Sequence, residues 1–236
     1  MAKYIVSSSP HISTTFTTRK MMLDVIIALI PATIASVLLY GFYPLCMMIL
    51  CVGTCVFSEW LFNVIGKRFQ SVGDLSAVVT GMILSLNLPP VVPFYVPIVG
   101  GFFAIVIVKM LFGGIGKNFV NPALAGRAFL LGSYAGVMTT WVDPAAGKAP
   151  LLGGAADVVT AATPLAYMKG SGDAVAASFA ELTAKYPVAD MFLGKTGGSL
   201  GEVSALLLIV GGVYLIWRKV INWQTPVAYI GTVAVL

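Results

Sequence analysis

Apolar segments about twenty residues long, broken by short turns, constrain this chain more than any other feature. Two of them open it, Met21 to Tyr40 and Tyr43 to Ile65, with a break at Gly41 and Pro44. A helix of roughly 20 apolar residues crosses a hydrocarbon layer ~30 Å thick. Only 10% of the residues are charged, against about a quarter in globular proteins. The sequence therefore predicts an all-α, polytopic bundle of membrane helices.

Further apolar segments follow, and two of them are unusual. The third, Leu75 to Leu88, is short and runs into prolines, which fits either a broken helix that lines a cavity or an ordinary crossing helix. The last begins near Pro226 and stops at Leu236, so at ~18 Å it is too short to span. We expect either that the native protein continues or that this copy is truncated. The other segments are Phe94 to Phe112, Asn121-Pro122 to about Trp141, and Val203 to Trp217.

The polarity pattern divides the chain into four parts. They are an N-terminal arm (1–20), five membrane helices (21–141), one sizeable polar loop (142–200), and a sixth helix with an incomplete seventh (201–236). Within the loop, 171–186 has weak helical spacing. Asp74-Leu75-Ser76-Ala77 is echoed by Glu202-Val203-Ser204-Ala205, which predicts an internal repeat of the kind found in membrane carriers.

Basic residues predict how the bundle is oriented. The turns Gly41 to Tyr43 and Leu88 to Pro93 hold no basic residue, whereas the N-terminal arm and the alternate loops do. The positive-inside rule then places the N-terminus in the cytoplasm and the 142–200 loop outside. The basic residues assigned to cytoplasmic segments are Lys3, Arg19, Lys20, Lys67, Arg68, Lys109, Lys117, Arg218 and Lys219.

The distribution of charge excludes some functions and leaves others open. The net charge of +5 comes from helix ends, without basic runs and interleaved aromatic residues, so we expect no nucleic-acid binding. The lone His11 does not indicate a metal site, and Cys46, Cys51 and Cys55 are expected to be buried free thiols. We expect Asp24 and Arg127 to snorkel, and Glu59 either to take part in ion movement or to bond a neighbouring helix.

Two polar stretches carry candidate sites. The glycine-rich loop Gly113 to Lys117 precedes a helix start, so it is either an anion cradle or a tight connection. The segment from Asp157 to Thr163, followed by Pro164, has the pattern Asp-x-x-Thr-small-Ala-Thr. That pattern resembles the flavinylation motif of bacterial respiratory complexes, although a hydroxyl-rich surface loop would also explain it.

Separated blocks of the chain resemble one family in the family's order. The family contains the RnfD protein of the Rnf complex, an ion-translocating ferredoxin:NAD oxidoreductase of bacterial membranes, and the NqrB protein of the sodium-pumping NADH:quinone reductase. The short N-terminal arm favours the Rnf member, and the family's second half is fuller than this chain's. The blocks are Ser8 to His11, Arg19 to Val25, Ala28 to Ala32, Asp74 to Gly81, Lys117-Asn118, Asn121 to Ala128 and Gly198 to Ala205.

The resemblance implies a role for the motif. Thr163 would carry flavin mononucleotide (FMN) through a phosphoester, attached by a separate flavin transferase that reads Asp157 and Thr160. Ala162 would keep the approach open, and Ala161 stands where the motif often has glycine. No independent catalytic residue is implied. Candidate flavin surroundings on the same side are Gly198, Gly201 and Glu202.

The resemblance also implies an electron-carrying subunit in the bacterial cytoplasmic membrane, coupled to sodium or proton translocation. Its partners would be other Rnf membrane and peripheral subunits, the transferase and membrane lipid. The sequence leaves open whether a second, unattached flavin (riboflavin) is bound as well. The alternatives are the quinone-reductase member of the family and a channel or carrier of the same fold without a redox role.

Overall fold

A computed structural model describes residues 16–142, 163, 182–183, 186–194 and 197–235 of the chain. Within these residues every regular element is a helix, as expected. The two longest are α1 (Thr18–Tyr40) and α2 (Phe42–Ile65), joined by Gly41 alone, whose φ of 89° favours glycine. Both are long and apolar enough to cross a membrane.

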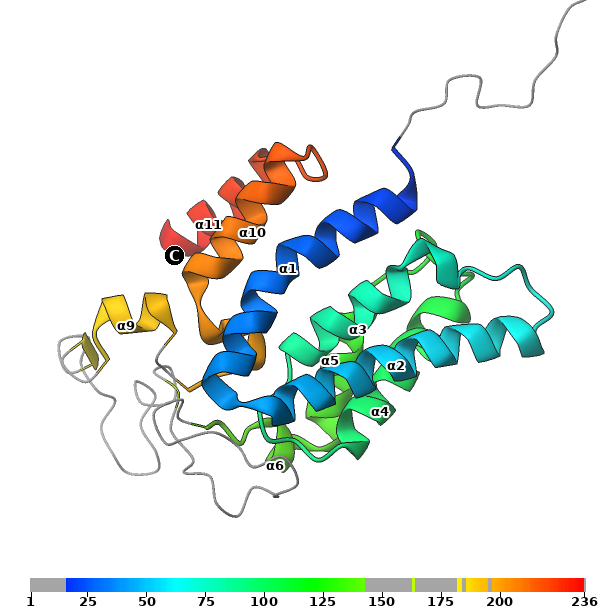
Figure 1. The fold of residues 1–236 in the computed structure, drawn as a ribbon, viewed down its shortest axis with the longest axis horizontal. Helices are drawn as coiled ribbons and strands as arrows, with labels where there is room; N and C mark the ends of the chain where they lie inside the picture. The colour runs from blue at the N-terminus through cyan, green and yellow to red at the C-terminus, as the bar shows by residue number, and fades with distance from the viewer. Residues whose placement is uncertain (1–15, 143–162, 164–181, 184–185, 195–196, 236) are drawn as a thin grey trace, which may run out of the picture.

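The following helices run back and forth beside this pair (Figure 1). They are α3 (Ser76–Leu86), α4 (Tyr95–Phe102) with its π-helical continuation η2 (Phe103–Met110), α5 (Pro122–Ser133), α6 (Ala135–Met138), α9 (Val188–Leu193), α10 (Ala205–Trp217) and α11 (Gln224–Val235). Loops 66–75, 111–121 and 218–223 lie at one end of the bundle, with the start of α1; we call this the basic end. Gly41, the 87–94 turn and residues 197–204 lie at the other end.

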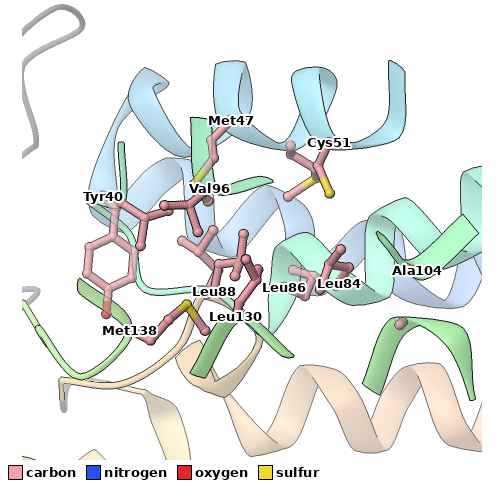
Figure 2. Packing of buried hydrophobic residues seen from close by; sticks show 14 of the residues in the cluster. Tyr40, Met47, Cys51, Leu84, Leu86, Leu88, Val96, Ala104, Leu130 and Met138 are labelled. Carbon is pink, nitrogen blue, oxygen red and sulfur yellow. The ribbon is translucent and has the colours of Figure 1, made fainter. Parts of the chain in front are cut away.

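The half-length helix α3 is the centre of the fold. It has 11 residues, about 16 Å at 1.5 Å per residue, and nearly all of them are buried. Figure 2 shows side chains of α2, α3, α4 and α5 converging around Leu84 and Leu86. Gly81 lets α2 approach, since a Cβ there would lie 2.7 Å from the Val52 Cα. A short third helix was predicted, and its burial favours the broken-helix interpretation.

The exterior of α1 shows why the bundle belongs in a membrane. Its buried face carries small or polar residues at every fourth position, from Asp24 through Ala28, Ala32 and Ser36 to Tyr40. Its exposed face carries Leu23, Ile27, Ile30, Ile34 and Leu38. A soluble helix has the opposite pattern, whereas membrane helices pack through small residues and turn large apolar ones to lipid.

Two expectations about the helices are wrong. The fifth helix does not continue to Trp141, because α5 ends at Ser133 and Tyr134 leaves the helical region at φ −131°, ψ 44°. Lys109 is not a loop residue. It lies on η2 with 2% of its surface exposed, because a buried acidic partner on α2 compensates for its charge.

Helices α3 and α10, which begin at the echoed tetrapeptides, resemble each other in the turn that leads into them. A 3-10 turn precedes each, η1 (Val72–Asp74) before α3 and η5 (Leu200–Val203) before α10. The two helices start from opposite ends of the bundle (Figure 1). The internal repeat stays a prediction, and most of the helical spacing at 171–186 falls outside the described residues.

Candidate functional site

The predicted flavinylation motif is described only at its last residue. Thr163 is half-buried, while Asp157, Thr160 and Ala162 lie outside the described residues. The Thr163 side chain is a secondary hydroxyl, which is a weak nucleophile until a base removes its proton. The three other predicted residues, Gly198, Gly201 and Glu202, are described and form one compact turn.

That turn is fixed by a reciprocal capping box. The Glu202 Oε2 accepts from the Ser199 N–H at 3.0 Å, and the Ser199 side chain accepts from the backbone N–H of Glu202. The Leu200 N–H donates to the Leu88 carbonyl at 3.1 Å, which ties the turn to the chain just after α3. Gly201 allows the turn to lie close to α3, because a Cβ there would crowd the Leu86 carbonyl oxygen at 3.0 Å.

A cavity of about 210 Å³ opens between this turn and the end of α3. Its polar lining includes Asn87, whose amide donates to the Ile83 carbonyl at 2.8 Å and whose Oδ1 accepts from Arg127 Nη1 at 2.8 Å. Arg127 therefore does not snorkel but positions Asn87. The cavity lining is Leu29, Ile83, Leu86, Asn87, Ser199, Gly201, Glu202 and Leu208.

A buried ion pair lies toward the basic end. Lys109 Nζ is 2.7 Å from Glu59 Oε2, and the two side chains are 3% and 0% exposed. Lys109 also donates to Ser76 Oγ at 2.5 Å, so one ammonium joins α2, the start of α3 and η2. A buried pair of this kind persists only when further hydrogen bonds satisfy both charges.

Those further bonds are present on both sides of the pair. Ser71 Oγ donates to Glu59 Oε1 at 2.5 Å and accepts from Asn63 Nδ2 at 3.0 Å. On the lysine side, Ser76 Oγ donates to Asp74 Oδ1 at 2.5 Å. A continuous polar chain thus runs from the bundle interior to the 71–75 loop. It matches the prediction of a bond from Glu59 to a neighbouring helix; a role in ion movement stays a prediction.

The sequence contained a signal for Lys109 that our prediction missed. Glu59 and Lys109 are the acidic and basic residues inside two long apolar segments, and an ionisable group within a membrane is best explained by a partner of opposite charge. Asp24 likewise does not snorkel. It is 3% exposed and joins α1 to α10 by accepting from Tyr214 Oη at 3.1 Å and Arg218 Nε at 3.2 Å.

A second cavity, about 130 Å³, lies beneath the glycine-rich loop. It is bordered by Ser76, Lys109, Asn118 and Asn121, and by the starts of α3 and α5. Asn121 caps α5 as predicted, accepting from the Ala123 N–H at 3.0 Å. The buried Asn118 Oδ1 has no hydrogen-bond partner in the described part of the chain. The loop therefore borders a small, mostly apolar cavity beside the buried lysine, and its role as an anion cradle stays a prediction.

The glycine-rich loop and the cysteines differ in how well they match the predictions. Gly113, Gly114 and Gly116 have positive φ, as a tight loop requires. All three cysteines are free; Cys51 and Cys55 are buried as expected, but Cys46 faces outward on α2. The described residues contain no cluster of His, Cys, Asp or Glu that could hold a metal ion.

Comparison with known proteins gives one family over almost the whole chain. The sequence model of the NQR2, RnfD, RnfE family matches residues 5–236. Among curated proteins, the chain is 42% identical over 232 residues to the D component of the Na(+)-translocating ferredoxin:NAD(+) oxidoreductase complex of Acetobacterium woodii, covering 98% of this chain and 67% of that protein.

Two further relatives carry similar names. The chain is 40% identical over 234 residues to the D component of the proton-translocating ferredoxin:NAD(+) oxidoreductase complex of Clostridium ljungdahlii, covering 99% of this chain and 68% of that protein. It is 37% identical over 244 residues to the D component of the ion-translocating oxidoreductase complex of Halorhodospira halophila, covering 97% of this chain and 68% of that protein. The chain thus spans about two-thirds of the length of these relatives.

Proposed function

Because the chain belongs to the NQR2, RnfD, RnfE family, we propose that it is an electron-carrying membrane subunit of a complex that couples ferredoxin:NAD electron transfer to ion translocation. The relatives named above are the D components of such complexes, one sodium-translocating and one proton-translocating. The resemblance was identified from motif blocks, and the match over residues 5–236 confirms the family. The quinone-reductase protein NqrB remains the alternative within this family.

The carrier group we propose is FMN, bound covalently to Thr163. The single observation that carries this proposal is the pattern Asp157 to Thr163, in which the last threonine is the acceptor. In the transfer, the Thr163 oxygen forms a bond to the flavin phosphorus, and the bond from that phosphorus to its nucleotide leaving group breaks. The threonine proton goes to a base of the transferase, because the hydroxyl is too weak a nucleophile alone.

The residues that would receive the flavin ring fit its chemistry only in part. The turn at 198–202 offers the Glu202 carboxylate, which is exposed, and a cavity lined by both apolar and amide groups. The bound flavin would supply one- and two-electron chemistry, while the protein sets its position and potential. The Ser199–Glu202 capping box keeps this turn rigid, which favours a fixed ring position.

We also propose a second, unattached flavin. Its candidate place is the cavity beneath the glycine-rich loop. Asn118 Oδ1 is a buried acceptor without a donor, and a flavin ring supplies an N–H donor. A buried acceptor left unsatisfied costs about 1–3 kcal/mol, so a donor there is favoured. At about 130 Å³ the cavity is well below the ~300 Å³ of small ligand pockets, so several lining side chains, among them Met22 and Ile115, would have to move.

The proposed orientation follows from the basic end of the bundle. Lys67, Arg68, Lys117, Arg218 and Lys219 belong to the loops at that end, so the positive-inside rule makes it cytoplasmic. The turn at 197–204 and residues 139–142, directly after α6, then face the outside. The covalent flavin and the Asn118 cavity would lie on opposite sides of the membrane.

A comparison of threonine variants tests the covalent site. The chain is produced beside an active flavin transferase, and in-gel flavin fluorescence is read after denaturation. We expect fluorescence from the wild type and from the control Thr139→Ala, which removes an exposed threonine after α6, but none from Thr163→Ala. Fluorescence that persists in Thr163→Ala, or an intact but colourless wild type, would contradict the proposal, and the colourless result would favour a channel or carrier.

A further inference from the structure

Arg127, half-buried on α5, is a cation of the bundle whose hydrogen-bond partner carries no charge. The two ion pairs in the described part of the chain each join a basic side chain to a buried carboxylate. They are Lys109 with Glu59 at 2.7 Å and Arg218 with Asp24 at 3.2 Å. Arg127 instead bonds the neutral amide of Asn87 at 2.8 Å. An ionised side chain within a membrane segment is costly and marks a functional site unless an opposite charge compensates for it.

Asn87 connects Arg127 to the cavity at the end of α3. It is the C-cap of that helix and lines the cavity together with Ser199 and Glu202. A guanidinium can only donate, so Asn87 Oδ1 faces Arg127, and Nδ2 donates to the Ile83 carbonyl at 2.8 Å. An amide nitrogen carries two hydrogens. Asn87 therefore keeps one N–H donor for an occupant of the cavity.

The bond from Arg127 changes what this amide favours. Hydrogen bonds in series polarise one another inside a protein, so a guanidinium on Oδ1 makes the Asn87 N–H a stronger donor. An oxygen that accepts from Asn87 Nδ2 would lie within about 8 Å of Arg127 Nη1, because each N–H···O bond is about 2.9 Å long. At that range in a medium of low dielectric, a positive charge stabilises a negative one. The pair therefore favours an acceptor oxygen that becomes more negative.

We infer that Asn87, positioned and polarised by Arg127, donates to a carbonyl oxygen of the covalent flavin and raises the flavin's reduction potential. The inference rests on the proposed function, which brings the ring to the turn at 198–202. Uptake of two electrons from ferredoxin, through the complex, with one proton leaves one negative charge on the ring, and Arg127 compensates for it. At about 210 Å³ the cavity is below the ~300 Å³ of small ligand pockets, so it receives the carbonyl edge of the ring and not the whole ring.

A purely structural role for the same contact leads to a different expectation. A cation beside the C-terminus of α3 complements the helix dipole, and the bond from Arg127 to Asn87 joins α5 to α3. A contact of that kind affects the stability of the bundle and leaves the potential of an attached flavin unchanged. The reduction potential therefore separates a positioning role from a structural one.

Spectroelectrochemical titration of the chain, purified from cells that contain an active flavin transferase, tests the inference. We expect Arg127→Gln to lower the equilibrium constant for flavin reduction about tenfold, which is about 30 mV for a two-electron couple. Arg127→Lys keeps the charge and is expected to stay near the wild type. Asn87→Asp keeps the bond to Arg127 but neutralises its charge, so we expect at least as large a decrease. The matched control Arg19→Gln removes an exposed arginine at the basic end and is expected to change nothing.

A variant on the opposite wall of the cavity is expected to shift the potential upward. Glu202→Gln removes a negative charge from the same cavity, and glutamine retains the capping box. In-gel fluorescence checks covalent attachment in each variant, and size-exclusion chromatography checks folding; if Arg127→Gln does not fold, Asn87→Asp decides. A wild type without attached flavin overturns the proposed function and this inference with it. Attached flavin whose potential does not fall in Arg127→Gln and Asn87→Asp, falls equally in Arg127→Lys, or does not rise in Glu202→Gln overturns the inference alone.

Discussion

At the scale of single residues, Lys109 joins more of the fold than its one charge suggests. Its ammonium contacts Glu59 at 2.7 Å and Ser76 Oγ at 2.5 Å, which joins three helical elements at one point. If either Glu59 or Lys109 is removed, the charge of the other stays buried and unpaired. If both are removed, only serine hydroxyls lose a bond, and these retain other hydrogen-bond partners. Ser71 keeps Asn63, and Ser76 keeps Asp74.

This difference predicts the behaviour of two variants. Lys109→Met alone is expected to lower the free energy of unfolding by about 3–5 kcal/mol, because Glu59 stays buried without a counter-charge. The double variant Glu59→Leu, Lys109→Met is expected to recover most of that loss. Denaturant titration in detergent measures both values. A double variant as unstable as the single one would show that the pair itself, rather than the orphaned charge, determines stability.

At the scale of elements, the close contact between α2 and α3 depends on one glycine. A Cβ on Gly81 would lie 2.7 Å from the Val52 Cα, which is backbone and cannot turn aside, whereas a Cβ on Gly53 of α2 would meet nothing within 4 Å. We expect Gly81→Ala to lower the free energy of unfolding by about 1–3 kcal/mol. We expect Gly53→Ala to raise it by roughly 0.5–1 kcal/mol. Equal effects of the two variants in the same titration would contradict this packing.

The elements also show what the sequence could predict. Continuous apolar segments place α1 and α2 within a few residues, and Asn121-Pro122 marks the start of α5, because length and capping are local properties. The end of α5 at Tyr134 and the inward position of Lys109 depend on partners distant in the chain. Helix α9 was missed although Pro187 and Gly194 flank it, because its segment has no long apolar run.

The site was predictable to a similar extent. Gly198, Gly201 and Glu202 were expected together, and they do form one turn. This part could be predicted because the glycines and the capping box are local signals that can be read from the sequence. Asn87 and Arg127 join that neighbourhood only through contacts between α3 and α5, so neither was recognised. The cavity beneath the glycine-rich loop also depends on residues from several elements, including Met22 and Lys109.

At the scale of the whole molecule, the positions of the loops predict a topology that thiol labelling can check. In a Cys46→Ala background, the buried Cys51 and Cys55 should not react. We expect an impermeant maleimide to label Thr139→Cys in intact cells and Gln70→Cys only after lysis, because these exposed residues lie at opposite ends of the bundle. The reverse pattern would place the basic end outside and contradict the proposed orientation.

The proposed function requires that the membrane bundle holds an electron carrier at a fixed position. Peptide mass spectrometry of the chain, purified from cells that contain an active flavin transferase, tests this most directly. The proposal predicts that the peptide containing Thr163 carries the added mass of one flavin mononucleotide joined through phosphate, and that it lacks this mass when the transferase is absent. Recovery of that peptide unmodified from a complex that transfers electrons would contradict it.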